Sequence, residues 1–469
     1  MTGLRPLIGR RHFLASAAVG TIAALLPVSG AQGATSPPES GAETLAPAPA
    51  ASTSGAAVVD VSAIGAAASL ETAGDPSIRP FRYHASDEEL ADLKRRIKAT
   101  RWPERETVND TSQGVRLATM QKLADYWANR HDWRRAETQL FSHPNFVTNI
   151  DGLDIHFIHV KSKHPNALPV IVTHGWPGSI IEQLKIIGPL TDPTNFGGTA
   201  ADAFDVVIPS LPGYGFSGKT TAPGWVVPRI AKAWDVLMKR LGYTRYVAQG
   251  GDWGNAISEV MALQQPPGLL AIHTNMSATL PESIRKALPA GPPPPGLSVE
   301  EQHAWDQLTD FYTHGLGYAL EMNQRPQTLY GVADSPIGLA SWMLDHDIQS
   351  YDLIARVFDG VSEGLTRDDI LDNVTLYWLT NTTVSSARLY WEMRNSKAGF
   401  FDPRGVPLPT GVSAFRYEIY QAPESWARTA YPHLVFYKAH DKGTHFAAWE
   451  QPRLLTEDMR ETFRSVRHT

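Results

Sequence analysis

Positions 250–254 read GGDWG, a motif that combines a reactive side chain with a tight turn. It follows an apolar stretch at Tyr246–Ala248 and precedes a helical pattern starting near Asn255, which indicates a strand-to-helix turn. Glycines are needed there because side chains would clash with neighbouring elements. The tip residue, Asp252, is a carboxylate, which attacks a saturated carbon and forms an alkyl ester, whereas serine would attack a carbonyl. The structural alternative is an aspartate that caps a helix in a glycine-rich turn.

Hydrolysis of an ester on Asp252 requires a base and an oxyanion hole. A second glycine-containing motif supplies hydrogen-bond donors for the oxyanion hole. The sequence HGWPGS at 174–179 directly follows the apolar stretch Val170–Thr173. A His-Gly loop at this place presents one backbone N–H to the oxyanion, and the residue after the nucleophile presents the other. We therefore assign the two donors to Trp176 and Trp253; a plain turn is the alternative.

The base is expected after the last predicted strand, His433–Tyr437. The chain holds 16 histidines, and His445 is distinguished by this position and by Gly443, which lets the loop turn. The carboxylate that orients the base should end the preceding strand, predicted at Val412–Tyr417, which gives Glu418. A carboxylate there fixes the imidazole tautomer and stabilises the cation formed during hydrolysis.

Two neighbours of His445 offer alternatives. His440 lies at the strand end and is the nearest competing base. Asp441 is only four residues before His445 and could hardly turn back to orient it, so we expect Asp441 in a solvated loop.

Alternating apolar strands and helical patterns, such as the helix predicted at Val227–Leu241, provide the frame for these residues. They predict a mostly parallel sheet with helices on both faces, and the order nucleophile, acid, histidine is that of the α/β-hydrolase fold. Upstream, Ser86–Glu89 forms a capping box that opens one helix, a second is expected at Val115–Arg130, and Asp151–Gly152 joins a hairpin. The predicted core strands are Pro169–Thr173, Phe204–Pro209, Tyr246–Ala248, Leu269–His273, Val412–Tyr417 and His433–Tyr437.

The first residues carry an export address. Arg10 and Arg11 precede an apolar run that ends near Val28, and small residues follow at Ala31–Gly33, a pattern that resembles a bacterial twin-arginine signal. The apolar run is short and rich in small residues, which argues against a membrane span, although an uncleaved anchor is the alternative. Residues 34–77 are rich in Ala, Pro, Ser and Thr and predict a disordered tether. We therefore expect an exported protein, periplasmic, secreted or at the cell surface.

Composition excludes several classes of function. Of 469 residues, 42% are hydrophobic and 19% charged, which is typical of a globular protein. The absence of cysteine excludes disulfides, a Cys nucleophile and thiolate metal sites. A net charge of -6 without any basic block argues against a nucleic-acid partner.

The motifs together resemble those of epoxide hydrolases of the microsomal and juvenile-hormone type, which have an N-terminal meander domain. The resemblance runs from about Ile78 to Pro452. It rests on LKRRI at 93–97, TRWP at 100–103, YW at 126–127, DWR at 132–134 with Glu137, IDGLDIHFIH at 150–159, HGWPGS at 174–179, GGDWG at 250–254 and GTHFAA at 443–448. With the termini included, the expected parts are an export signal (1–33), a linker (34–77), the meander (78–165), the first part of the core (166–277), a helical lid (278–395) and the second part of the core (396–469).

The resemblance also implies roles for two lid tyrosines. Tyr318, in GLGY at 315–318, and Tyr390, in SSARLY at 385–390, stand where the family binds the epoxide oxygen, and Glu418 matches its orienting acid. A phenol can donate to that oxygen as negative charge grows during ring opening. The implied reaction converts a small apolar epoxide and water into a vicinal diol without a metal or cofactor.

The sequence departs from the family at two places. The microsomal members begin with a membrane anchor, where this chain has the signal and the tether, so location does not carry over. Thr444 stands before His445 where glycine is usual, and we expect a small shift of that loop.

Two other functions would use the same residues. A haloalkane dehalogenase would share Asp252 and hold halide with the ring N–H groups of Trp176 and Trp253; the lid tyrosines and the meander favour epoxides. An inactive hydrolase fold that serves as a binding protein would have no need for a complete Asp–Glu–His set. Asp252 itself excludes a serine esterase.

Overall fold

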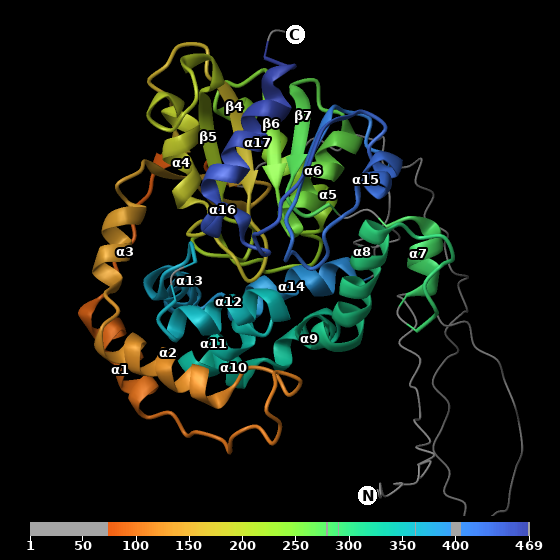
Figure 1. The fold of residues 1–469 in the computed structure, drawn as a ribbon. Helices are drawn as coiled ribbons and strands as arrows, with labels where there is room; N and C mark the ends of the chain where they lie inside the picture. The colour runs from red at the N-terminus through yellow and green to blue at the C-terminus, as the bar shows by residue number, and fades with distance from the viewer. Residues whose placement is uncertain (1–73, 278–279, 289, 362, 395–404, 468–469) are drawn as a thin grey trace, which may run out of the picture. The chain divides into compact units, whose positions relative to one another are not determined.

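A nine-stranded sheet is the frame of the structure, a computed structural model that describes residues 74–277, 280–288, 290–361, 363–394 and 405–467 (Figure 1). The strands follow the order β1-β2-β3-β5-β4-β6-β7-β8-β9. The predicted export signal and most of the predicted tether lie outside the described residues. The last residues of the predicted tether, 74–77, are exposed, and the carbonyl of Pro76 accepts a hydrogen bond from the hydroxyl of Thr148 at 2.9 Å.

One edge of the sheet is antiparallel. It consists of β1 (Arg79–Pro80), β2 (Asn145–Ile150) and β3 (Leu153–Val160), and β3 runs antiparallel to β5. The predicted hairpin is confirmed: Asp151 and Gly152 both have positive φ, 53° and 81°, as a tight turn between twisted strands requires.

The rest of the sheet is parallel, and all its strands except the partly exposed edge strand β9 are buried on both faces, which is why they consist mostly of apolar residues. For most predicted strands, both ends lie within two residues of the ends that the structure shows. The prediction for Val412–Tyr417 was wrong: this strand ends at Ala414, because the chain then leaves the sheet and Tyr417 N–H donates to the carbonyl of Gly443 at 2.8 Å. The parallel strands are β4 (Leu168–Thr173), β5 (Phe204–Pro209), β6 (Tyr246–Gly250), β7 (Leu269–Thr274), β8 (Thr410–Ala414) and β9 (Leu434–Ala439).

Helices cover both faces of the parallel strands (Figure 1). On one face α4 (Leu184–Thr191), α16 (Ala447–Glu450) and α17 (Pro452–Arg464) pack together, and on the other α5 (Val227–Arg240) packs on α6 (Trp253–Gln264). The predicted α/β-hydrolase arrangement is therefore present. A short helix, α15 (Glu424–Ala430), precedes β9.

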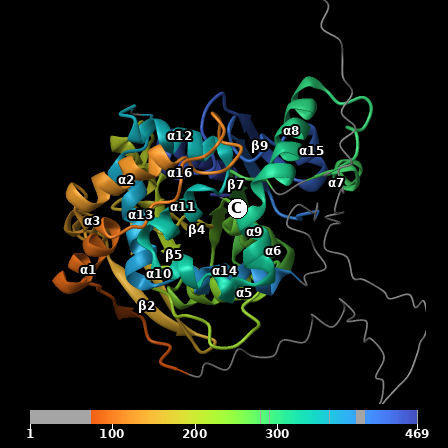
Figure 2. The same cartoon turned by 90° about the horizontal axis from the view of Figure 1, so that it is seen from below.

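The N-terminal helices lie against the lid. They are α1 (Asp87–Lys98), which opens on the predicted Ser86–Glu89 capping box, α2 (Leu117–Asn129) and α3 (Trp133–Leu140). Figure 2 shows them beside lid helices α10, α11 and α13. Buried Asp372 of α13 accepts hydrogen bonds from His131 at 2.8 Å and from Arg135 at 2.5 Å, so these helices hold α13 in place.

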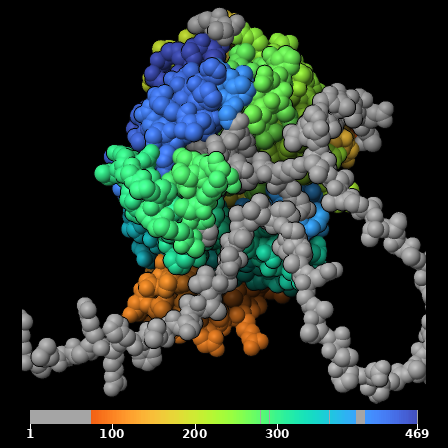
Figure 3. Space-filling view, turned by 90° about the vertical axis from the view of Figure 1, so that its right-hand side faces the viewer, coloured from red at the N-terminus to blue at the C-terminus, as the bar shows by residue number. Residues whose placement is uncertain are grey.

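The lid lies at the carboxyl ends of the parallel strands, between the core and the N-terminal helices (Figure 3). Its side chains hold two core loops: Asn373 and Tyr377 donate to the carbonyls of Pro177 and Gly178 at 2.8 and 2.7 Å, and Ser385 donates to that of Gly213 at 2.6 Å. The lid helices are α7 (Glu282–Ala287), α8 (Val299–Asp310), α9 (Gly317–Gln324), α10 (Tyr330–Asp334), α11 (Pro336–Leu344), α12 (Ile348–Phe358), α13 (Arg367–Thr380) and α14 (Thr383–Met393), with a π-helical turn at Phe311–Gly315.

Within the described ranges, none of the helices combines the length and the apolar character that a membrane crossing requires.

Candidate active site

Asp252 occupies a strained turn between β6 and α6. Its φ of 52° and ψ of -129° lie outside the regions that side chains prefer, and such strain persists where the surroundings enforce it. A Cβ on Gly250 would lie 2.2 Å from the backbone of Gly254, and one on Gly254 would lie 1.9 Å from Thr173 O. The glycines are thus required by close backbone contacts, and α6 begins at Trp253, slightly before the predicted start.

The loop after β4 supplies a hydrogen bond to this carboxylate. The backbone N–H of Trp176 donates to Oδ1 of Asp252 at 2.8 Å. A Cβ on Gly175 would lie 2.1 Å from the same oxygen, so glycine permits the close approach. Trp253 is the first residue of α6, so its N–H belongs to the positive end of the helix, beside Asp252. The structure therefore brings both predicted donor residues to the nucleophile.

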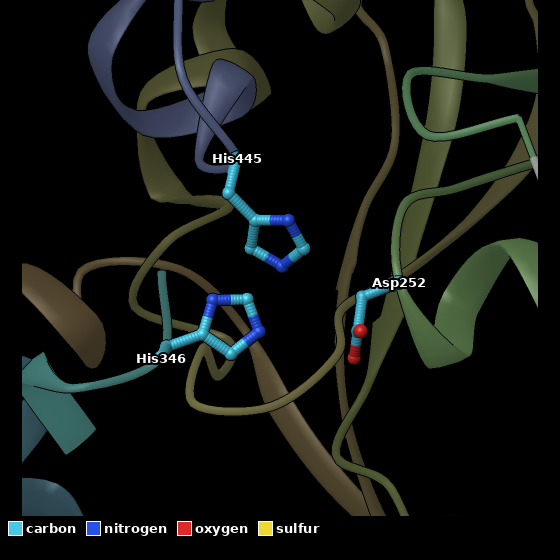
Figure 4. Close-up of side chains that lie close together, drawn as sticks. All are labelled: Asp252, His346 and His445. Atoms are coloured by element: carbon cyan, nitrogen blue, oxygen red, sulfur yellow. The ribbon is translucent and has the colours of Figure 1, made fainter. Parts of the chain in front are cut away.

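His445 and Glu418 form a buried pair facing Asp252. Nδ1 of His445 lies 2.7 Å from Oε1 of Glu418, which also accepts the N–H of Ile419 at 2.8 Å. This contact leaves Nε2 as the ring nitrogen available for chemistry, and Figure 4 shows the ring of His445 near Asp252 and near a second histidine, His346.

The charge of His445 depends on its acidic neighbours. Burial alone would lower the pKa of His445, but the charge and hydrogen bond of Glu418, with the charges of Asp252 and Asp347, raise it to about 10. The free site therefore holds an imidazolium against the carboxylate of Asp252.

His440 and Asp441, the alternatives considered for the base and its orienting acid, make other contacts. His440 bonds Asp458 through Nε2 at 2.5 Å and stacks on Phe415, while Asp441 is exposed, as expected. Thr444, the departure from the family pattern, donates through its N–H and its hydroxyl to Glu450. The hydroxyl thus adds a contact that fixes the loop before His445.

Two lid tyrosines complete an aromatic wall around Asp252. Tyr318 of α9 stacks on the ring of Trp176 with centroids 4.7 Å apart, and Tyr390 of α14 meets Trp253 edge to face at 4.9 Å. The two tyrosine rings lie 6.1 Å apart. Burial, with the charge of Asp252, raises the pKa of both phenols well above their usual range. Both hydroxyls therefore keep their protons and can donate hydrogen bonds.

His346 is a member of the site that sequence reasoning missed. It lies between α11 and α12, buried, and its ring centroid is 4.4 Å from that of His445. Asp252, His346 and His445 each offer one ligand atom, all within 4.8 Å of one another, and form the one group of this kind found among the described residues. These donors could hold a metal ion, which would occupy both the nucleophile and the base. No sequence motif surrounds His346, and only its proximity in the fold identifies it.

A cavity of about 590 Å³, lined in part by Asp345 and Asp347 on either side of His346 in the chain, is here called the acidic cavity. It is lined by the loop at 110–114, by α8 and the π-helical turn, and by the start of α12. Four aspartates line it, and its described lining includes no lysine or arginine. Asp347 belongs to the lining and also bonds His346, which lies beside Asp252. The four are Asp110, Asp310, Asp345 and Asp347.

Comparisons with known proteins agree with this geometry. The family model "Epoxide hydrolase N terminus" matches residues 78–183, and the model "alpha/beta hydrolase fold" matches residues 169–312. A protein of Stigmatella aurantiaca is 50% identical over 83% of this chain and 86% of its own length. Epoxide hydrolase 1 of Oryctolagus cuniculus is 36% identical over 82% of this chain and 88% of its own. The crystal structure of juvenile hormone epoxide hydrolase from the silkworm Bombyx mori superposes with a TM-score of 0.73 at 30% identity, covering 84% of this chain and 96% of that one.

The pKa of His445 should fall when Asp252 loses its charge. The variant Asp252→Asn keeps the shape of the side chain and removes the anion that stabilises the imidazolium. Nuclear magnetic resonance titration of the histidine ring nitrogens should show a lower pKa for His445 in the variant than in the wild type. The control Asp441→Asn, in the exposed loop, should leave that value where it is, and an unchanged value in Asp252→Asn would contradict the assigned coupling.

Proposed function

We propose that this chain, which belongs to the epoxide hydrolase family of the α/β-hydrolase fold, converts an epoxide and water into a vicinal diol through an ester on Asp252. The named relatives favour this activity over haloalkane dehalogenation and over an inactive fold. The observation that carries the mechanism is a carboxylate oxygen bonded to Trp176 N–H at 2.8 Å, beneath protonated phenols and beside His445.

The first step opens the ring. An oxygen of Asp252 attacks an epoxide carbon, a C–O bond forms, and the C–O bond of the ring breaks. Tyr318 or Tyr390 donates its proton to the departing oxygen, which leaves a hydroxyl on the ester and a tyrosinate in the wall. Because the ester is neutral, His445 loses an anion that stabilised its proton. The proton of His445 then neutralises the tyrosinate, and the imidazole becomes a base.

The second step hydrolyses the ester. His445, oriented by Glu418, takes a proton from water while the water oxygen bonds to the carboxyl carbon of Asp252. The N–H groups of Trp176 and Trp253 stabilise the oxyanion, and donors of this kind lower barriers by ~3–4 kcal/mol. The intermediate collapses, the C–O bond to the substrate breaks, and the carboxyl proton passes to the departing oxygen. The diol leaves Asp252 ionised and His445 protonated, without any metal or cofactor.

Two substitutions separate these steps. Asp252→Ala should abolish diol formation from styrene oxide and other small epoxides, because no nucleophile remains. His445→Gln should still open the ring but retain the ester, seen as an intact-protein mass increased by the mass of the substrate. Diol formation by Asp252→Ala at the wild-type rate would refute the mechanism.

The acidic cavity indicates which epoxides reach the site. We propose that substrates approach through it, because Asp347 lines it and also contacts the histidine beside Asp252. Four carboxylates, in a described lining that holds no lysine or arginine, repel anions over several ångströms. We therefore expect the substrate to be an epoxide without a negative charge.

A pair of matched epoxides tests this selectivity. At low salt, an epoxide bearing a carboxylate should have kcat/KM about tenfold below that of its neutral methyl ester. Asp110→Asn combined with Asp310→Asn should reduce the difference in kcat/KM between the two substrates. Asp306→Asn, which removes one charge from an exposed residue outside the lining, should reduce this difference less than either single substitution in the lining does. Equal kcat/KM values for the two substrates would exclude this route.

We propose that the protein is exported as a folded chain. The support is the sequence pattern at Arg10–Arg11, the apolar run after it and the small residues at Ala31–Gly33. Replacing both arginines with lysine should retain the protein inside a bacterial host, as measured by fractionation. Unchanged export of that variant would exclude the twin-arginine route.

A further inference from the structure

We propose that His346, held by Asp347, positions the water that hydrolyses the Asp252 ester. This role rests on the proposed two-step mechanism and adds a residue to its second step. The group consists of His346 and Asp347, here called the second histidine–carboxylate pair, and it comes from the lid, whereas His445 and Glu418 come from the core.

The second histidine–carboxylate pair is as well fixed as the first. Nδ1 of His346 lies 2.9 Å from Oδ2 of Asp347, and both side chains are buried. The other oxygen of Asp347 accepts the N–H of Ser350 at 2.8 Å and caps α12. Burial would raise the pKa of Asp347, but the hydrogen bond of His346 and the nearby charges hold it below its usual value. The carboxylate is therefore an anion that accepts the Nδ1 proton of His346.

The remaining nitrogen of His346 faces the reacting groups. Within the described part of the chain, its buried Nε2 has no hydrogen-bond partner. The ring lies 5.1 Å from that of Tyr318 and 4.4 Å from that of His445, and Figure 4 shows it turned toward Asp252. A buried polar atom without a partner is costly, which points to a bound group during the reaction.

The geometry suits a water molecule. Because the three ligand atoms of Asp252, His346 and His445 lie within 4.8 Å of one another, one point lies within about 2.8 Å of all three. That separation is the length of a hydrogen bond to water. The two histidines are linked to carboxylates through Nδ1, so each presents Nε2 to this point.

Two acceptors would orient this water for attack. Once Asp252 is esterified, His445 is neutral and accepts one water proton through Nε2. His346 donates through Nδ1 to Asp347 and accepts the other water proton through Nε2. With both hydrogens held, a lone pair of the water oxygen points at the ester carbon. His445 alone takes the proton, and His346 acts as a positioning residue.

Single-turnover kinetics with His346→Phe test the assignment, with styrene oxide as the probe. The phenyl ring keeps the contacts with His445 and Tyr318 but removes Nε2. We expect ester formation and kcat/KM close to wild type, ester hydrolysis slower by about 100-fold, and a parallel fall of kcat and KM. The ester should accumulate in the steady state, visible by intact mass. His346→Gln, which restores an acceptor near Nε2, should recover part of the hydrolysis rate.

A buried pair at the junction of the N-terminal helices and the lid provides the matched control. His131 bonds Asp372 at 2.8 Å, so His131→Phe also removes a buried histidine–carboxylate contact. We expect it to lower the thermal midpoint without accumulating ester. If His346→Phe unfolds, His346→Gln is compared with wild type instead. We expect a smaller slowing of ester hydrolysis in that variant.

Three results would overturn the assignment. One is wild-type hydrolysis in both His346 variants; another is equal slowing of ester formation and hydrolysis, which indicates a packing role. The third is a wild-type rate that EDTA removes and Zn²⁺ restores, since the three ligand atoms would then hold an ion. A wild type that forms no ester while still producing diol would instead refute the two-step mechanism itself.

Discussion

A carboxylate buried beneath an aromatic wall is the constraint on which the rest of the site depends. Asp252 is only 6% exposed, and a buried charge is costly unless partners compensate it. The loop after β4 supplies Trp176 N–H, α6 supplies its positive end, and the last core loop supplies the imidazolium of His445. Each of these partners has a second use once the carboxylate becomes an ester, because the N–H groups can then hold the oxyanion and His445 can act as base.

The lid makes this chemistry possible by enclosing it. Tyr318 stacks on Trp176 and Tyr390 meets Trp253 edge to face, and α13 ties the lid to the loop after β4 through Asn373 and Tyr377. The N-terminal helices fix α13 from the other side through Asp372. The N-terminal domain therefore contributes to the site indirectly, by holding the helix that anchors the lid.

Sequence reasoning located the core residues because they lie at the ends of strands, where loop motifs are short and positions are fixed. Asp252, Trp176 and His445 each follow a strand directly or after a short loop, but the strand before Glu418 was drawn too long because Phe415 and Tyr417 resemble strand residues. The roles of the two lid tyrosines were predicted only from the family resemblance, because a helical sequence pattern does not show which aromatic side chain faces the site. His346 left no signal, because Asp347 has the pattern of an ordinary helix cap.

The origin of the oxygen in the product tests the ester mechanism most directly. A single turnover in oxygen-18 water, with enzyme in excess over epoxide, should leave the label in the carboxylate of Asp252 and produce an unlabelled diol. Mass spectrometry of the peptide that contains Asp252 and of the diol measures both. A labelled diol with an unlabelled Asp252 would mean that water attacks the epoxide itself, and would contradict the account.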